Sequence, residues 1–596
     1  MRPNVLSSAH TSTVYWLALL ALAVASYVYG LGGQYVPSIG DEMVYTHIAR
    51  ATAETGHWLP LASELPDTRN TKPPLLFWQA MVAGDWGQHW SMAALRAPSL
   101  IYTLLIAAAI ASCVRLVTRR WPEALLAACL YLAFFSTFRY GRPYLTSAPE
   151  TFWFSLPLFG LLWQRLRAPA SSPGWGLHIV FGLGLGLGLA YKSFALIAPA
   201  AAAWWLALVL SEAHLNWRTL LGHTLRTALS ATLGLGVFAL WFVLDPDPAA
   251  VWREFIVGEN AAKFSDARGY WQEALSLSGS SIWSQLLAYA VNAGLLFFVV
   301  LGLGWLGLKN LPRLRAHWPL PPHLATLLGW SLVWLLVFLF PSQRSARYVI
   351  PAMPAVAMLL ALYWRDIGRL WFVPTLLLSA LALLVLGRIA WVGHSLQLST
   401  IGEISLTLLV MAAGALVIAA GLWRASWTRT CALLACLFVY AGFGLTVAPL
   451  DGAAGRYAAQ VTQRLLATGS GDARGVAVPN NFNGQYERYR FLLPGRHRFV
   501  PYDTDARALA RVQPGSTLPT PAGQLDMLLA GHAAVVWGQS SQEEVAPPCL
   551  PGCSVLGERW QLRSRYLRGE ITWANLWHPQ QWLFRREWVL ARAIAR

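Results

Sequence analysis

The sequence predicts a mainly α-helical, polytopic membrane protein with about thirteen transmembrane helices and a small C-terminal α/β domain. Of the 596 residues, 56% are hydrophobic and only 12% are charged, whereas an ordinary soluble domain carries about 25% charged residues. The mean hydropathy is +0.45. This composition excludes a disordered chain and an ordinary water-soluble enzyme.

The net charge of +17 does not indicate a nucleic-acid partner. Only four of the 45 basic residues are lysines, and such arginine-rich usage is typical of coding bias. A basic excess is also what cytoplasmic loops and anionic lipid head groups produce in a membrane protein. We therefore expect a membrane-embedded chain with no nucleic-acid function.

A helix needs about 20 apolar residues to cross a hydrocarbon core of about 30 Å. The first apolar stretch has no cleavage motif of small residues, so we expect a membrane anchor there and not a removed signal peptide. The two stretches beside Lys192 nearly touch and could form one broken element, so the count is about twelve to fourteen. The expected spans are 13–31, 92–114, 121–138, 148–166, 175–190, 193–211, 224–244, 283–307, 325–341, 347–364, 370–391, 403–422 and 430–449.

Arginines in short loops predict the orientation, because they are retained on the cytoplasmic side. With a cytoplasmic N-terminus, the inside loops hold clearly more arginine than the short outside loops. This predicts a multi-pass protein of the bacterial inner membrane. Loops 32–91 and 245–282, and the tail from 455, then face the periplasm.

The expected domains are a transmembrane catalytic domain, 1–454, and a periplasmic α/β domain, 455–596. The second has turn clusters and short β-rich pieces but no long apolar run. Within it Cys549 and Cys553 flank a Leu-Pro-Gly turn, and either a disulfide or two free thiols fits this spacing. The first domain is expected to carry amphipathic periplasmic helices at about 41–56 and 73–87.

Two adjacent acids, Asp41 and Glu42, follow the first span, and Tyr45 lies one turn further on. A short helix along the membrane surface would place a carboxylate where a lipid-borne substrate passes, so both acids are candidate catalytic residues. Tyr45 is a candidate contact for donor or acceptor. The spacing from Ser38 also fits a helix cap for Asp41, and both interpretations stay open.

Lys72 stands before two prolines that fix the entry into the second surface helix. A lysine at the membrane boundary can bind a phosphate as a compact charge, although such a lysine can also simply extend to the aqueous interface. Three of the four lysines, Lys72, Lys192 and Lys263, fall on the predicted outside. This distribution opposes the usual charge bias and indicates an anionic ligand.

The other predicted outside segments add acids and cations at head-group level. Glu150 starts a span, where it can cap the helix or act as a functional carboxylate. Acids for proton transfer beside cations for phosphate suit group transfer from a lipid phosphate. The further candidates are Glu259 and Lys263 in the long loop, Arg139, Arg142 and Lys192 as donor or acceptor contacts, and Arg344, Arg347 and Tyr348 before a late span.

Three motifs resemble the polyprenyl-phosphate-dependent membrane glycosyltransferases of the GT-C class: Asp41-Glu42, Lys72-Pro73-Pro74, and Arg347-Tyr348-x-x-Pro351-x-x-Pro354. Within this class the sequence looks like the lipid A aminoarabinose transferases and the protein O-mannosyltransferase-like group, over about residues 10–450. The resemblance implies a GT-C fold and an inverting transfer of a monosaccharide from undecaprenyl phosphate. The implied acceptor is a lipid A-like glycolipid, a glycan or a protein in the periplasm.

The resemblance also implies roles for single residues. Asp41 would be the general base or orient the acceptor, Lys72 and Lys263 would hold the donor phosphate with Tyr348 near it, and Arg344 falls where a lysine is frequent. The chain departs from the aminoarabinose transferases at Thr71 and Asn260, where that family has Glu and His thought to serve a metal. Val44 and Ser147 also replace an arginine and an aspartate, with Glu150 a stand-in for the latter. No cofactor is therefore expected, although a divalent metal stays an open alternative, and neither the aminoarabinose donor nor the lipid A acceptor itself is carried over.

Two other functions compete with the transferase. A transporter or flippase for a lipid-linked or anionic solute would also use broken helices, glycine ladders and charges at membrane depth. The charges here crowd one surface and the spans show no paired halves, which favours the enzyme. An inactive scaffold with a partner-binding outer domain is the third interpretation.

Overall fold

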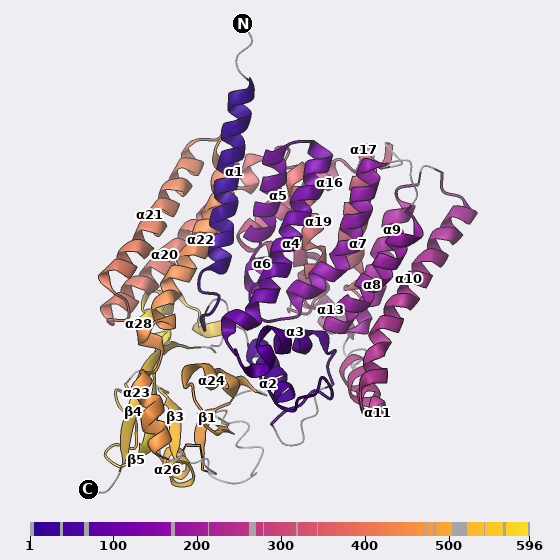
Figure 1. Ribbon diagram of the computed structural model, residues 1–596. Coiled ribbons are helices and arrows are strands. Elements are labelled where there is room, and N and C mark those ends of the chain that lie inside the picture. Colours follow the sequence, from indigo (N-terminus) through magenta and orange to yellow (C-terminus); the bar gives the residue numbers. More distant parts are fainter. Residues whose placement is uncertain are drawn as a thin grey trace.

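The structure is a computed structural model, and it divides visibly into a helical bundle and a smaller part that contains a sheet (Figure 1). Within the described part, all strands fall between residues 476 and 592. The described ranges are 5–35, 40–64, 71–168, 173–212, 214–261, 270–277, 279–316, 320–342, 344–468, 470–471, 474–480, 484–503, 521–540, 543–563 and 568–593.

Helices cover each of the apolar stretches expected from the sequence. Several of the expected spans are divided into shorter pieces, most clearly between residues 282 and 309. The bundle contains α1 (Val5–Val28), α4 (Met92–Thr118), α5 (Trp121–Ala133), α6 (Phe135–Tyr140), α7 (Ser147–Arg167), α8 (Trp175–Tyr191), η2 (Phe194–Leu196), α9 (Ile197–Val209), α10 (Trp217–Leu244), α14 (Ile282–Leu286), α15 (Ala288–Ala293), η4 (Gly294–Leu296), α16 (Phe297–Lys309), α17 (Leu311–Ala316), α18 (Pro322–Val337), η5 (Ala346–Ala352), α19 (Met353–Leu362), η6 (Arg369–Trp371), α20 (Val373–Ser395), α21 (Ile401–Trp423) and α22 (Thr428–Asp451).

Six helical stretches in the described residues are long and apolar enough to cross a bilayer, and shorter apolar helices lie beside them. The chain is therefore a membrane-embedded, mainly helical protein. The six are Met92–Thr118, Trp217–Leu244, Ala288–Lys309, Arg369–Ser395, Ile401–Trp423 and Thr428–Asp451.

Glycines on α8 allow α7 and α10 to approach closely from two sides. A Cβ at Gly186 would lie 2.5 Å from the Val237 Cβ and 2.8 Å from the Gly234 oxygen of α10. On the other side, a Cβ at Gly188 would lie 2.7 Å from the Phe154 ring of α7. Small residues at this spacing let membrane helices pack backbone to backbone.

Two short helices lie across one end of the bundle, on the side that carries the sheet (Figure 1). They are α2 (Gly40–Glu54) and α3 (Leu75–Ala83), followed by the turn η1 (Asp85–Gly87). Met43, Ile48 and Phe77 pack between these helices and the start of α4 in a separate apolar core. The long loop after α10 lies near this end and contains α11 (Pro248–Val251), η3 (Trp252–Ala261) and α13 (Tyr270–Leu275).

The C-terminal part contains one five-stranded sheet of order β2-β1-β3-β5-β4. β1 pairs in parallel with β2 and β3, whereas β5 pairs antiparallel with β3 and β4. Buried side chains such as Val478, Val536 and Trp588 form cores on its two faces. The elements are η7 (Ala453–Gly455), α23 (Ala459–Ala467), β1 (Val476–Pro479), η8 (Gln485–Glu487), α24 (Arg488–Leu492), β2 (Phe499–Tyr502), α26 (Pro521–Gly531), β3 (Ala534–Gly538), β4 (Cys553–Leu562), η9 (Arg568–Glu570), α27 (Trp573–Trp577), α28 (Pro579–Trp582) and β5 (Phe584–Arg592).

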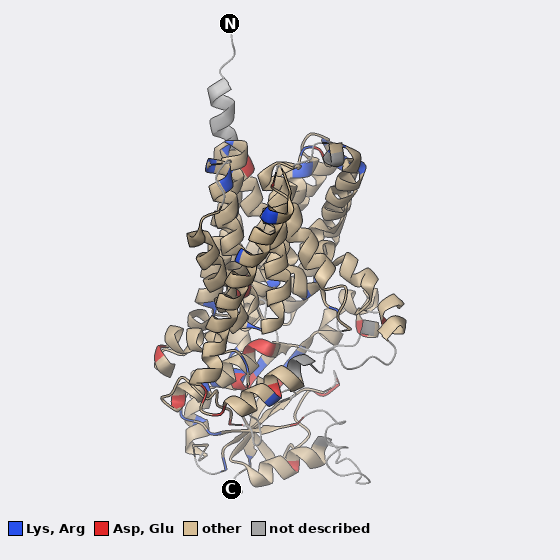
Figure 2. Ribbon diagram, turned by 90° about the vertical axis from the view of Figure 1, so that its right-hand side faces the viewer, with Lys and Arg blue, Asp and Glu red and all other residues tan. Residues whose placement is uncertain are grey.

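Cys549 and Cys553, which the sequence left as either a disulfide or two thiols, form a disulfide at the start of β4. Charged residues gather at the two ends of the bundle and around its junction with the sheet, with few between (Figure 2). This distribution is the one that a bilayer around the middle of the bundle requires, because unpaired charges are costly in hydrocarbon.

Candidate functional site

A cavity of about 420 Å³ opens where α2 and α3 meet the bundle. Its walls come from segments far apart in the sequence: α2, the Lys72 segment, the turn after α8 and the segment that enters η5. The described lining residues are Asp41, Tyr45, Lys72, Pro73, Leu76, Phe77, Thr146, Tyr191, Lys192, Ser193, Ala195, Leu196, Phe255, Phe338, Pro341, Ser345, Arg347 and Tyr348.

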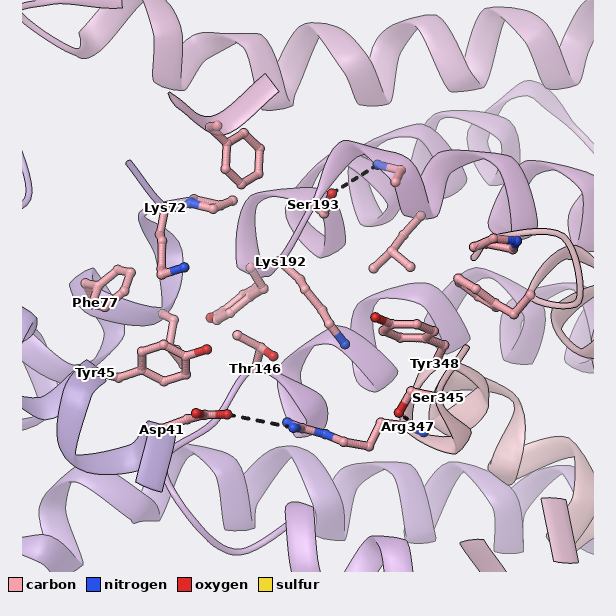
Figure 3. A pocket seen from close by; sticks show the side chains of 18 residues that line it. Asp41, Tyr45, Lys72, Phe77, Thr146, Lys192, Ser193, Ser345, Arg347 and Tyr348 are labelled. Carbon is pink, nitrogen blue, oxygen red and sulfur yellow. Dashed lines mark hydrogen bonds and ion pairs between the residues drawn. The ribbon is translucent and has the colours of Figure 1, made fainter. Parts of the chain in front are cut away.

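Asp41 faces Arg347 across this cavity (Figure 3). The carboxylate Oδ2 lies 3.7 Å from Nη1 of Arg347, and the two side chains are 43% and 39% exposed. Asp41 is the second residue of α2, so its carboxylate lies at the positive end of the helix dipole. Arg347 also stacks on Tyr140, with its guanidinium 4.8 Å from the ring centre. The cavity thus holds an accessible carboxylate beside a guanidinium that a planar contact holds in place.

Lys192 supplies a second cation, and Glu150 supports it from behind. Nζ of Lys192 lies 2.8 Å from Oε2 of Glu150, and Glu150 is 1% exposed. The other oxygen of Glu150 has no hydrogen-bond partner in the described structure. Lys192 lies in the turn between the end of α8 and the start of η2. Glu150 is thus placed to hold Lys192, while Lys192 itself lines the cavity.

Lys72 and Tyr348 complete the polar lining, and aromatic side chains form much of the remaining wall. Figure 3 shows Lys72 and Lys192 pointing into the same space as Tyr348. Tyr45 lies one turn beyond Asp41 on α2, and its ring packs edge-on against Phe77 with centres 5.8 Å apart. The cavity thus combines three cations, one accessible carboxylate and apolar walls, which suits a phosphate joined to an apolar chain.

Glu42, which the sequence marks as a candidate catalytic residue, lies outside the cavity lining. Its carboxylate is fully buried and binds the Arg96 guanidinium through two contacts of 2.7 Å. It also accepts a hydrogen bond of 2.8 Å from the backbone N–H of Tyr144. Glu42 does not line the cavity, because it fastens the first turn of α2 to α4.

Three expected arginines also lie outside the cavity lining. Arg142 is fully buried and donates to the carbonyls of Tyr27 and Tyr29. Arg344 is 4% exposed, and it donates to the carbonyls of Leu339 and Ser280 and to the Tyr270 hydroxyl. Arg139 stacks on Phe135 and Tyr140. These arginines were expected to contact phosphate or substrate. In the structure they instead contact carbonyls, a hydroxyl and aromatic rings of the protein itself.

Two expected residues of the long loop cannot be placed in the site: Lys263 and the side chain of Glu259 lie outside the described part of the chain. The side chain of Asn260 does too. Thr71 is buried and offers a neutral hydroxyl. Among the described residues, no group of three or more His, Cys, Asp or Glu side chains could hold a metal ion.

Several lining residues were missed by sequence reasoning. Tyr191 and Ser193 flank Lys192, Phe255 lies in the long loop 245–282, and Phe338 lies in the apolar stretch 325–341. The proximity of Tyr191 and Ser193 to Lys192 was an available signal. Nothing in the pattern distinguishes Phe338 from a membrane-facing aromatic residue.

The helical bundle, the two short helices across its end and the polar cavity beneath them resemble the fold of GT-C class membrane proteins. The structure of ArnT from Cupriavidus metallidurans bound to undecaprenyl phosphate matches 97% of this chain and 98% of that chain, with a TM-score of 0.59 at 15% identity. The expected GT-C fold is thereby confirmed.

Sequence relatives agree with this fold. The family model for dolichyl-phosphate-mannose-protein mannosyltransferases matches residues 41–252. The undecaprenyl phosphate-alpha-4-amino-4-deoxy-L-arabinose arabinosyl transferase 1 of Sodalis glossinidius is 27% identical over 361 residues, 59% of each chain. The corresponding transferase of Yersinia enterocolitica is 24% identical, over 59% of this chain and 62% of that protein. The chain thus matches about three fifths of the length of these relatives, and the resemblance to GT-C glycosyltransferases is confirmed.

Proposed function

We propose that this protein is a glycosyltransferase that moves a monosaccharide from a polyprenyl phosphate, undecaprenyl phosphate in bacteria, to a periplasmic acceptor. The acceptor is a lipid A-like glycolipid, a glycan or a protein. The observation that carries the proposal is the meeting of Asp41 with Lys72, Lys192 and Arg347 in one cavity with aromatic walls. The named activities of the Sodalis and Yersinia relatives support it.

In this proposal the acceptor oxygen attacks the anomeric carbon of the donor sugar. A bond forms between that oxygen and the anomeric carbon, the bond from the anomeric carbon to the phosphate oxygen breaks, and the configuration inverts. Asp41 receives the acceptor proton as general base. Lys72, Lys192 and Arg347, with Tyr348 beside them, neutralise the charge that grows on the departing polyprenyl phosphate. The aromatic walls hold the sugar and the first part of the prenyl chain.

The same proposal includes the arrangement in the membrane. The bundle, residues 1–454, crosses the inner membrane about thirteen times with a cytoplasmic N-terminus. Residues 455–596 form a periplasmic domain. The excess of arginine in the predicted inside loops supports this orientation, and the contact of α2 with η8 places the first loop and the C-terminal part at the same end of the bundle.

A transporter is not favoured. The charged lining residues lie at one end of the bundle, beneath α2 and α3. Transport of a bound solute would require such groups near the middle of the membrane.

The proposal is tested with the purified full chain in lipid nanodiscs and radiolabelled undecaprenyl-phosphate sugars. Sugar transfer to extracted envelope acceptors and release of undecaprenyl phosphate are both measured. Asp41→Asn is expected to lower kcat about 10²- to 10⁴-fold, the usual contribution of a general base. Because Asp41 is 43% exposed, this variant should retain its fold. Full activity in Asp41→Asn would remove the carboxylate from the mechanism.

A further inference from the structure

The helix that carries Asp41 is held from outside by the C-terminal part of the chain. Turn η8 contacts α2 through Glu487, which is fully buried. Oε1 of Glu487 lies 2.6 Å from Nε of Arg50, and Oε2 lies 3.2 Å from Nη2 of Arg50 and 3.1 Å from Nδ1 of His47. One carboxylate thus joins two successive turns of α2 to a segment more than 400 residues away in the sequence.

Further contacts make this junction tight. Arg50 also binds Glu64 at 2.8 Å, and the hydroxyl of Tyr486 donates to Glu64 at 2.8 Å. A Cβ at Gly484 would lie 2.9 Å from the Cβ of His47. A side chain at Gly40 would overlap the amide of Gln485. The backbone of the η8 segment therefore approaches α2 so closely that α2 cannot move toward it.

The other end of α2 is fastened to the bundle by the buried pair of Glu42 and Arg96. Asp41 is the neighbour of Glu42 in the sequence, and Tyr45 follows one turn later. Asp41 and Tyr45 both line the cavity. The helix is therefore fixed at two points, by α4 at its start and by Glu487 at its second half.

We propose that Glu487 is a positioning residue, which sets the placement of α2 and thereby of Asp41 in the cavity. It touches neither the cavity nor a reacting group, and it acts through Arg50 and His47. This inference rests on the proposed transferase function and extends the catalytic unit to the C-terminal part. A buried carboxylate that loses its charge leaves Arg50 partly unpaired, so the contact is strongly favourable only when complete.

The test uses the full chain with spin labels at two exposed sites, Thr55 directly after α2 and Val243 on α10, which is 78% exposed. Glu487→Gln removes the charge, and Gly484→Ala presses on His47 from the same side. The control is Glu570→Gln, since Glu570 pairs with Arg563 at the surface of the same part and away from α2. Electron-spin distance distributions and transfer kinetics are measured for each variant.

Both Glu487→Gln and Gly484→Ala are expected to broaden or shift the distance distribution and to lower kcat at least about tenfold. The donor KM should change less than about threefold, because the phosphate cations remain on their own elements, and Glu570→Gln should match the unsubstituted protein. An unchanged distance distribution in both variants would overturn the inference, as would a displaced α2 with normal kcat. If the unsubstituted chain transfers no sugar, the proposed function fails, while the distances still decide whether Glu487 places α2.

Discussion

Replacement of Glu42 by Gln separates a structural role from a catalytic one, because the two roles predict different losses. Both Glu42 and Arg96 are 0% exposed, and they share two contacts of 2.7 Å. The glutamine amide would point a donor at one guanidinium N–H, and the Arg96 charge would lose its counterion. Removal of one partner from a buried pair costs about 3–5 kcal/mol.

The lower end of this range is expected here. Nη1 of Arg96 still donates to the carbonyls of Leu31 and Gly33 at 2.9 and 2.7 Å, so part of its charge stays solvated by the backbone. We therefore expect a loss of about 3 kcal/mol in the free energy of unfolding, or a Tm lower by at least about 3 °C.

The assay is thermal unfolding in detergent, followed with a dye that reacts with newly exposed thiols. Cys113, Cys129 and Cys436 are buried and free, and they report loss of the bundle. The control is Glu558→Gln, whose pair with Arg586 is 3.9 Å long with side chains 59% and 36% exposed. Such a pair contributes about 0–1 kcal/mol. A Glu42→Gln protein that keeps the control's Tm but transfers no sugar would refute this reasoning and assign Glu42 to the chemistry.

Three further predictions concern other parts of the chain. Lys72→Ala is expected to raise the donor KM about 10- to 100-fold, the equivalent of one charged hydrogen bond of about 1.5–3 kcal/mol, and an unchanged KM for a labelled donor would contradict its phosphate role. Burial alone would raise the pKa of Glu64, but Arg50 and Arg490 outweigh burial and lower this pKa to about 2. Because the folded state then binds fewer protons than the unfolded state, the stabilisation is complete above about pH 4.5 and is lost toward pH 2. A plot of Tm against pH should therefore fall more steeply in acid for the unsubstituted chain than for Glu64→Gln. Gly186→Ala should destabilise the contact of α8 with α10 by about 1–3 kcal/mol, whereas Gly176→Ala, with open space at its Cβ, should leave Tm unchanged, and equal Tm values for the two variants would argue against the close packing.

The positions of the helices could be predicted from the sequence, because the thickness of the bilayer sets how many consecutive apolar residues a spanning helix needs. Their breaks could not. The stretch 283–307 reads as one span, but Gly294 adopts a φ of 63° and its backbone lies against Phe135. That contact joins segments about 160 residues apart, and no local pattern announces it.

The candidate site was only partly predictable for a similar reason. Asp41, Lys72, Lys192 and Arg347 meet in the cavity, and the loop charges predict that all four lie on one side of the membrane. The predicted side of the membrane also selected Glu42, Arg142 and Arg344, which are buried and bind protein groups outside the cavity. The side of the membrane can be inferred from loop charges, but the direction of a side chain depends on partners such as Arg96, which is 54 residues from Glu42.

The junction between Arg50 and Glu487 also bears on how the protein is made. The two residues are 437 positions apart, so a ribosome completes nearly the whole bundle before the carboxylate exists. Until then Arg50 can pair with Glu54 and Glu64, which are close to it in the sequence, and α2 can attach to the bundle through Glu42 and Arg96 alone. The contact that fixes the second half of α2 can therefore form only after the residues of η8 have been synthesised, long after α2 itself.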